Sequence, residues 1–186
     1  ISTFIIKDQL QLIQQKKLGY DRENVLILDM DGKLNSKKEL IKTELLMIPS
    51  VKVVSTAYES PVTIKGGYNM SGADASKQMG VAANPVDEHY ITATGLELIA
   101  GTNLTRQDVL DASNEDYTKN YFHFVLNESA AKALGWTAQE AIGKKMFLDE
   151  SRPGEVRGVV KDFHFKALQE TIEPFAFRFY NNPSAG

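Results

Sequence analysis

The chain has 186 residues, of which 42% are hydrophobic, so it can bury a core as one domain or as two joined lobes. Its net charge is −3 and no run of Lys or Arg exceeds two residues, which excludes the positive field that a nucleic-acid partner requires. The chain contains no cysteine, and this excludes disulfides, thiolate catalysis and cysteine-based metal sites.

The first 18 residues carry an apolar stripe with helical spacing that begins at Ile1 and continues to Ile13. They lack the basic start and the cleavage site of a signal peptide, and their apolar stretch is too short to span a bilayer. Two interpretations remain open for this segment: an amphipathic helix packed on the core, or the aqueous end of a transmembrane helix.

A strand, helix, strand unit is predicted next. The apolar run at residues 24–30 is typical of a strand buried on both faces. Ser36 and Glu39 have the spacing of a capping box, which predicts a helix that ends before Pro49. Residues 51–58 form the second predicted strand.

The composition then shifts toward Gly, Ser and Asn between residues 59 and 86, and Gly66-Gly67 predicts a tight hairpin. A short helix or turn is expected around Tyr90, followed by Gly95 and a brief extended piece that ends at Gly101. A strand is predicted at 121–126. Local spacing predicts three helix N-termini, at Thr105 with Asp108, at Asn127, and at Thr137 with Glu140.

The remaining sequence predicts two strands with a helix between them. In the first strand, residues 154–165, the spacing places Val156 and Val160 on one side and Val159 on the other. A helix is expected at 167–172. The last strand, 175–180, alternates and gathers three phenylalanines on one face. We predict that they belong to the core, and any exposed part of this stripe on an edge-like strand would be a docking surface.

One motif suggests catalysis. An apolar strand followed by Asp29 and Asp31 resembles the haloacid-dehalogenase-type phosphatases, in which these carboxylates serve as nucleophile and as acid/base beside Mg²⁺. Ser55 and Thr56 would end a second strand of such a site. Lys33 stands where that family has Thr, and the later strands lack the paired acidic residues that hold the metal. A phosphatase that uses Asp29 and Asp31 is therefore kept as an alternative function.

The three histidines, His89, His123 and His164, are scattered without the spacing of a metal site, so we predict structural roles for them. We assign no catalytic, cofactor-binding or metal-binding residue. The sequence is accordingly interpreted as a protein that is not an enzyme and has no cofactor.

Several ordered segments carry a family resemblance. They are HYITATGLELIAGTNLTRQD (89–108), FVLNESAAKALG (124–135), AIGKKM (141–146) and EVRGVVKDFHFKALQETIEP (155–174). Together they resemble the periplasmic core domain of MacB-type ABC transporter permeases, a group that includes FtsX-like and lipoprotein-releasing permeases. Residues 9–28 resemble the segment that follows a membrane helix in the two-repeat permeases of Bacteroidetes.

The resemblance implies an α+β (mixed α/β) fold with two lobes. A porter lobe would be formed by residues 19–60 and 151–186, a sabre lobe would be inserted at 61–150, and residues 1–18 would be the membrane-proximal end of a transmembrane helix. The family continues after its equivalent of strand 175–180 with a strand, a helix and a strand. An exposed sheet edge is therefore expected beside 175–180.

The implied function is that of a non-catalytic domain of an inner-membrane permease, exposed to the periplasm, which couples ATP-driven motion of membrane helices to a periplasmic substrate or partner protein. The expected partners are a cytoplasmic ATPase, a second permease copy or repeat, and the membrane through transmembrane helices outside this sequence. No nucleic acid is expected. A stand-alone periplasmic binding module remains a further alternative.

Overall fold

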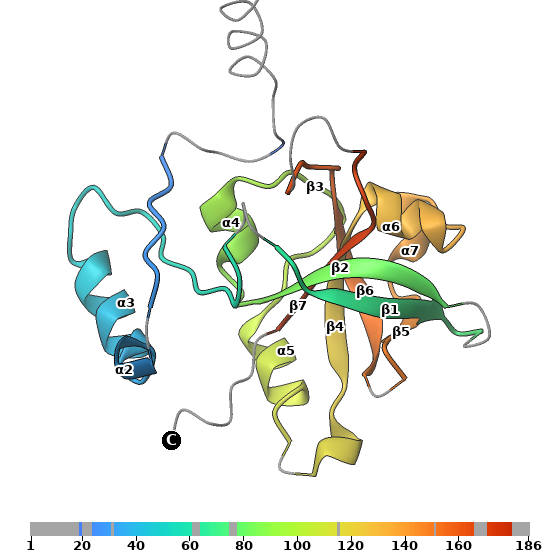
Figure 1. Cartoon of the computed structure of the whole chain (residues 1–186), viewed down its shortest axis with the longest axis horizontal. Coiled ribbons are helices and arrows are strands. Elements are labelled where there is room, and N and C mark those ends of the chain that lie inside the picture. Colours follow the sequence, from blue (N-terminus) through green and yellow to red (C-terminus); the bar gives the residue numbers. More distant parts are fainter. Residues whose placement is uncertain are drawn as a thin grey trace, which may run out of the picture.

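The computed structural model describes residues 19, 24–30, 32–60, 64–74, 78–114, 116–150, 152–165 and 171–179, and the structural statements below concern these residues (Figure 1). The segment predicted as a helix at 1–18 lies outside them, as does most of the helix predicted at 167–172.

The described residues form short helices and seven strands. The helices are α2 (Gly32–Asn35), α3 (Lys38–Leu46), α4 (Tyr90–Thr94), α5 (Arg106–Asp111), α6 (Glu128–Ala133) and α7 (Ala138–Ala141), with a 3₁₀ turn at Tyr117–Lys119. The strands are β1 (Gly67–Gly72), β2 (Met79–Val86), β3 (Leu98–Gly101), β4 (Phe122–Asn127), β5 (Lys145–Leu148), β6 (Pro153–Val160) and β7 (Phe175–Phe179). This confirms the α+β class.

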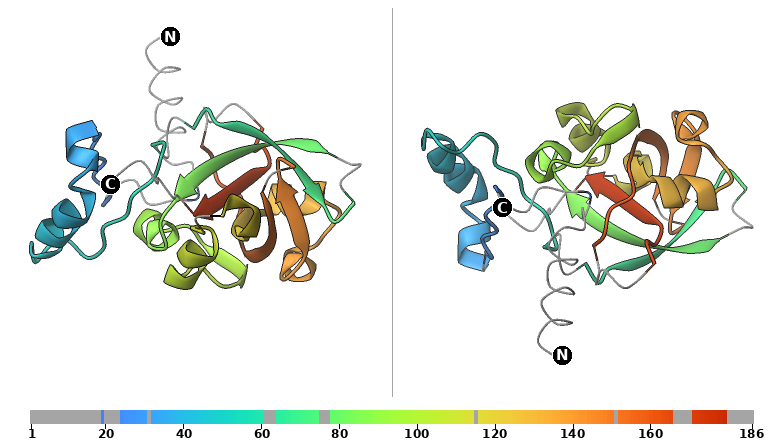
Figure 2. Two further views of the ribbon diagram at one scale, coloured as in Figure 1. Left: turned by 90° about the horizontal axis from the view of Figure 1, so that it is seen from below. Right: turned by 90° about the horizontal axis from the view of Figure 1, so that it is seen from above.

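The seven strands belong to one sheet with the order β3-β6-β4-β7-β2-β1-β5, and β5 also pairs with β6. Six strands therefore pair in a closed circuit, while β3 pairs with the end of β6 that β5 leaves free. Figure 2 shows the strands together, with α2 and α3 to one side of them. The pairs β2–β7 and β4–β6 are parallel, and the others are antiparallel. Closure gives every strand of the circuit a partner on both sides, whereas β3, outside the circuit, pairs with β6 alone among the described strands.

Two groups of buried side chains form the core, one on each face of the strands. The first gathers Phe124, Leu126, Met70, Met146 and Val156 with small residues of α6 and α7. The second gathers Val86, Tyr90, Val125, Phe163, Phe165, Phe175 and Phe177. Ring centroids of Phe165 and Phe175 lie 4.6 Å apart and those of Phe175 and Phe177 lie 4.7 Å apart, so these aromatic side chains contact one another directly.

The expectation of an exposed sheet edge beside 175–180 is wrong, whereas the prediction that its phenylalanines belong to the core is confirmed. Strand β7 lies between β2, with which it is parallel, and β4, with which it is antiparallel. Phe175 and Phe177 are fully buried, and Phe179 is 6% exposed. The alternation was correctly predicted, but the sequence does not say how many neighbours a strand has.

The expected division into lobes at residue 150 does not coincide with the sheet. Strands β6 and β7 were expected in the porter lobe. They pair with β2, β4 and β5, which were expected in the sabre lobe. The physical reason is continuity of the backbone hydrogen bonds across the boundary. The described strands form one unit, and residues 24–60 lie beside it (Figure 1).

Residues 24–30 and 51–58 are not strands in the structure, although both were predicted to be. The described part of the first segment makes no ladder, and Leu26 is 82% exposed. In the second segment the sole sheet-like contact of the described residues is an isolated bridge between Ala57 and Val86. An apolar run favours a strand, but a strand forms only where a partner backbone is available.

The helix start at Ser36 was also wrong. Helix α3 begins at Lys38, and its N-cap residue Lys37 makes no side-chain capping bond. Ser36 instead donates its hydroxyl to the carbonyl of Lys33. The helix itself, and its end before Pro49, are confirmed. Gly66-Gly67 is not a hairpin turn, because β1 starts at Gly67 and this residue pairs with Ala82.

The predictions from residue 89 onward are largely confirmed. Helix α4 ends at Gly95 in the left-handed conformation, and β3 ends at Gly101. The capping boxes at Thr105 and Thr137 and the cap at Asn127 are all present. Asn127 does more than cap α6: its side chain also accepts from the Phe175 amide and donates to the Glu173 carbonyl.

Strand β6 contains an irregularity that the spacing did not predict. Its register with β4 shifts between Phe124 and Val125, so Arg157 has no partner in this pairing. Val159 therefore joins Val156 in the first core group, while Val160 belongs to the second, contrary to the predicted faces.

Gly154 of β6 sits where any side chain would collide with the backbone of Phe122 and with the ring of Phe124. We predict that Gly154→Ala costs about 3 kcal/mol of unfolding free energy, because the β4–β6 pairing must separate locally. Gly80→Ala on β2 is the matched control, since a Cβ there meets nothing within 4 Å. Urea unfolding of both variants checks this, and equal stability of the two would contradict it.

Candidate functional site

Asp87, directly after β2, binds a segment that precedes the sheet in sequence. Its carboxylate accepts hydrogen bonds from the Lys42 ammonium at 2.9 Å, the Ser55 hydroxyl at 2.6 Å, and the Thr56 amide and hydroxyl at 2.8 and 3.1 Å. The backbone amide of His89 donates to it as well, at 3.1 Å. We call Asp87, Lys42, Ser55 and Thr56 the Asp87 joint.

The joint is shielded from water. The side chains of Asp87 and Lys42 are 7% and 16% exposed. Burial by itself raises the pKa of Asp87, but the hydrogen bonds from Ser55, Lys42 and Thr56 outweigh it and hold that pKa below its ordinary value of 3.8. The carboxylate is therefore ionised at neutral pH and bound as a charged group.

A second polar link lies three residues before Asp87, at Asn84 of β2. The Asn84 side chain accepts from the Glu59 amide at 3.1 Å and donates to the Glu59 carbonyl at 2.9 Å, which imitates the bonding of a neighbouring strand. The Glu59 carboxylate in turn accepts from the amides of Lys65 and Gly66. Residues 55–59 are thus attached along β2 mainly by side chains.

Two residues of the motif that suggested a phosphatase, Ser55 and Thr56, belong to the Asp87 joint. The Ser55 and Thr56 hydroxyls are hydrogen bonded to Asp87. Asp29 lies in an exposed extended segment without strand pairing, and Asp31 lies outside the described residues. The described part of the chain therefore does not bring Asp29, Ser55 and Thr56 to the ends of adjacent strands.

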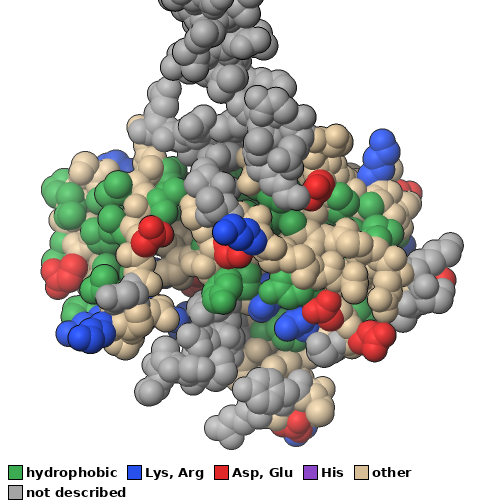
Figure 3. All heavy atoms as spheres, viewed as in Figure 1, with side chains coloured by type: hydrophobic (Ala, Val, Ile, Leu, Met, Phe, Trp, Pro, Cys, Tyr) green, Lys and Arg blue, Asp and Glu red, His purple; other side chains and the backbone are tan. Residues whose placement is uncertain are grey.

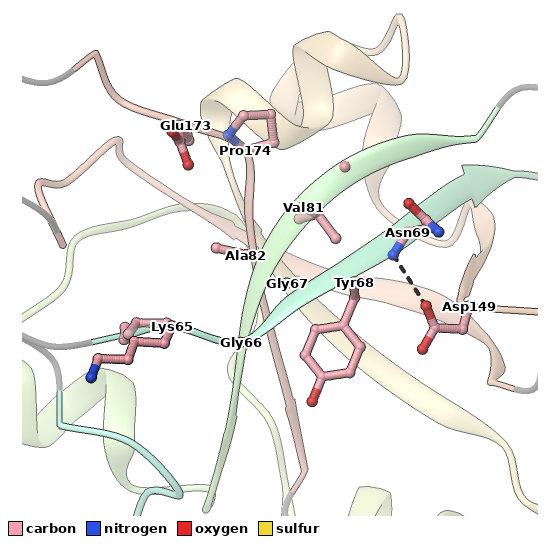
Figure 4. Close-up of a pocket in the computed structure, with 12 residues that line it drawn as sticks. Lys65, Gly66, Gly67, Tyr68, Asn69, Val81, Ala82, Asp149, Glu173 and Pro174 are labelled. Atoms are coloured by element: carbon pink, nitrogen blue, oxygen red, sulfur yellow. Dashed lines mark hydrogen bonds between the residues drawn. The ribbon is translucent and has the colours of Figure 1, made fainter.

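An open groove of about 720 Å³ runs along β1 and β2 (Figure 4). Its lining comes from 64–69 and 80–82, together with Asp149, Glu173 and Pro174. Asp149 accepts from the Asn69 amide at 3.1 Å and from Arg152 at 2.6 Å. These groups can bind a polar or extended segment, but they do not form an acid/base pair aimed at one reacting atom.

A third arrangement joins α5, β4 and β6, and we call it the His123 cluster: Asp108, Asp111, His123, Glu155 and Arg157. The imidazole Nε2 lies 3.3 Å from Asp108 and 3.2 Å from Asp111, and Nδ1 lies 3.6 Å from Glu155. Arg157 donates to Asp108 at 2.7 Å. Asp108 is fully buried and His123 is 5% exposed.

A capping box that the sequence predicts positions one member of the His123 cluster, Asp108. The predicted capping box orients Asp108, whose Oδ2 accepts from the amide and hydroxyl of Thr105. A hydrogen bond from Gln107, assisted by His123 and Arg157, holds the pKa of Asp111 below its ordinary value. The meeting of these residues with β6 was missed, because it depends on the irregularity at Arg157 and not on sequence spacing.

The other two histidines lie apart from this cluster. His89 precedes α4, is 51% exposed and has Glu88 at 3.9 Å. His164 follows β6 and is half-buried. Their structural roles, like that of His123, stay predictions.

Exposed apolar side chains gather in the segment before the sheet. Figure 3 shows hydrophobic groups over the region of α2 and α3. The exposed members are Leu26, Ile27, Leu28, Leu34, Leu40, Leu46, Met47 and Ile48. Among the described helices, none has the length and apolar content needed to cross a membrane.

Parts of solved structures are similar to this chain. The periplasmic region of MacB from Actinobacillus actinomycetemcomitans superposes with a TM-score of 0.51 at 20% identity, over 83% of this chain and 56% of that one. The extracellular domain of the noncanonic ABC-type transporter YknZ from Gram-positive bacteria gives a TM-score of 0.47 at 16% identity, over 76% of this chain and 61% of that one.

The MacB superposition confirms, at the level of fold, the family resemblance predicted from the sequence. This chain spans little more than half the length of that solved region. No protein-family model matches the sequence, and no curated protein matches it.

We predict that Asp87→Asn lowers the unfolding free energy by about 3 kcal/mol at neutral pH, because the amide leaves the Lys42 ammonium without its counter-ion. The folded-state pKa of Asp87 lies below the unfolded value of 3.8, so the carboxylate's contribution is complete above pH 3.8 and is lost as the pH falls further. The difference between wild type and variant should therefore shrink below pH 3.8.

Urea unfolding at neutral and acidic pH measures this difference. Glu97→Gln is the control, because Glu97 forms an exposed ion pair with Lys161 and its loss should cost no more than about 0.5 kcal/mol. If the difference in unfolding free energy between Asp87→Asn and wild type is the same at both pH values, the Asp87 carboxylate is not bound as a charged group.

Proposed function

We propose that this chain is an extracytoplasmic domain of an ABC transporter permease and transmits motion without performing chemistry. The MacB-like fold supports this, as does the order of the sequence motifs from His89 to Pro174. The proposed location is the periplasmic side of the inner membrane. The proposed partners are a cytoplasmic ATPase, a second permease copy or repeat, and a periplasmic substrate or partner protein.

The observation that carries the proposal is the Asp87 joint. A domain that passes motion onward needs a stiff connection between the segment that receives a displacement and the body that delivers it. In this chain α3 contributes Lys42, the segment after α3 contributes Ser55 and Thr56, and all three bind one buried carboxylate at the end of β2. Charge-assisted bonds of 2.6–2.9 Å resist separation better than an exposed ion pair does.

From the joint, a displacement would pass into the sheet through β2. This strand pairs with β1 on one side and with β7 on the other. Because the pairing continues around a closed circuit, β2 cannot slide without moving its neighbours. We propose that residues 24–60 belong to the porter part of the domain and that the sheet carries the surfaces that contact the substrate or partner, such as the groove along β1 and β2 (Figure 4).

A topology experiment tests the location. The chain has no cysteine, so Lys119→Cys, at a side chain that is 68% exposed, provides a single reactive thiol in this domain of the full-length protein. We predict that a membrane-impermeant maleimide labels it in intact spheroplasts. A cysteine placed in the cytoplasmic ATPase should react only after lysis. Labelling of residue 119 that also requires lysis would refute an extracytoplasmic domain.

A distance measurement tests the joint. Spin labels at Glu39→Cys on α3 and Lys132→Cys on α6 report the separation of the two parts in the full-length permease with its ATPase. We predict a narrow distance distribution that is unchanged by nucleotide in the wild-type background and broadened by Asp87→Asn, because the variant removes the charge-assisted bonds of the Asp87 joint and leaves only neutral links such as that between Asn84 and Glu59. Glu97→Gln should leave it narrow. A wild-type distribution that broadens or shifts with ATP would refute rigid transmission.

A further inference from the structure

Three side chains of the His123 cluster have the spacing of metal ligands. One ligand atom from each of Asp108, Asp111 and His123 lies within 4.8 Å of the other two. His123 Nε2 is 3.3 Å from Asp108 Oδ1 and 3.2 Å from Asp111 Oδ2. Two ligand atoms on a tetrahedral Zn²⁺ with bonds of about 2.0 Å stand about 3.3 Å apart, so these separations match with little rearrangement.

The other imidazole nitrogen provides an independent indication. His123 is 5% exposed, and its buried Nδ1 has no hydrogen-bond partner among the described residues. A histidine that binds a metal through Nε2 carries its proton on Nδ1, and such a proton normally faces a carboxylate or carbonyl. Glu155 Oε1 lies 3.6 Å from Nδ1 and is placed to accept it after a small side-chain adjustment.

The formal charge of the cluster also favours a divalent cation. Asp108, Asp111 and Glu155 contribute three negative charges, and Arg157 contributes one positive charge. With a neutral imidazole the sum is −2, which a divalent ion balances. Two of the three ligands are buried, and a buried unbalanced charge is costly.

Arg157 is the group that an ion must displace. Its guanidinium lies 2.7 Å from Asp108 Oδ1 and 3.4 Å from His123 Nε2. The side chain is 32% exposed, and Glu155 already lies 3.7 Å from its Nη1, so it can leave Asp108 and keep a carboxylate partner. Binding of the ion and the Arg157–Asp108 contact therefore compete.

We propose that Asp108, Asp111 and His123 bind Zn²⁺, with Glu155 orienting the imidazole and Arg157 acting as the competing cation. One imidazole nitrogen with two carboxylate oxygens suits Zn²⁺ better than Ca²⁺ or Mg²⁺, which prefer oxygen ligands alone. The site would fix α5 to β4. The proposed transmission of motion does not require zinc, so a failure to detect zinc binding would leave the proposed function unchanged.

The test is calorimetric titration of ZnCl₂ into the chelator-treated 186-residue chain, with MgCl₂ as the comparison ion. We expect saturable binding of one Zn²⁺, no binding of Mg²⁺, and a zinc-dependent rise of the thermal midpoint. Cobalt titration should give the visible absorption of a tetrahedral site. Absence of saturable zinc binding would overturn the proposal.

Variants assign the ligands. Asp111→Asn alters a partly exposed residue and should weaken zinc binding more than about tenfold without unfolding the chain, while Glu155→Gln should weaken it by about 10- to 100-fold. Arg157→Gln should strengthen zinc binding, because the competing cation is gone. The control His89→Gln should bind like wild type. If Asp111→Asn binds zinc unchanged, or Arg157→Gln weakens binding, the cluster is an ion-pair network and the proposal is wrong.

Discussion

Strand β6 carries the pairing on which the rest of the sheet depends. One side of it pairs with β4 along nearly its whole length, and the other side is shared by β5 at its start and β3 at its end. The contact with β5 closes the circuit that continues through β1, β2 and β7. Strand β6 needs Gly154 opposite Phe122 because it approaches β4 closely there, and it needs Gly158 because Leu98 of β3 and the neighbouring Thr102 come near on its other side.

The irregularity in β6 also connects the sheet to its surroundings. The register shift leaves Arg157 unpaired against β4, and its side chain reaches the buried Asp108 of α5. Asn127 has the corresponding role at the far end of β4, where one side chain binds α6, the Phe175 amide and the Glu173 carbonyl. Polar side chains of two strands thus fix helices to the circuit: Arg157, inside β6, binds the buried Asp108 of α5, and the buried Asn127, at the end of β4, caps α6.

Local features of the sequence predicted local structure well from residue 89 onward, whereas the capping box at Ser36 and the hairpin at Gly66-Gly67 did not form. Capping boxes at Thr105 and Thr137, the cap at Asn127 and the glycines at 95 and 101 depend on neighbours within a few residues, and all formed as predicted. Residues 24–30 and 51–58 failed because an apolar run says nothing about the presence of a pairing partner. The Asp87 joint and the His123 cluster were missed for a related reason: Lys42 and Asp87, or Asp108 and Arg157, meet across long stretches of chain.

The position of β7 has a consequence for how the chain folds. Residues 175–179 are inserted between β2 and β4, so those two strands cannot be joined until almost all of the described sequence has been synthesised. Closure then requires a parallel pairing between residues 82–86 and 175–179, a contact of high sequence separation that forms slowly. Until it forms, the apolar faces that receive Phe175 and Phe177 are open to other chains, so protection by a chaperone during this interval would favour the native sheet over aggregation.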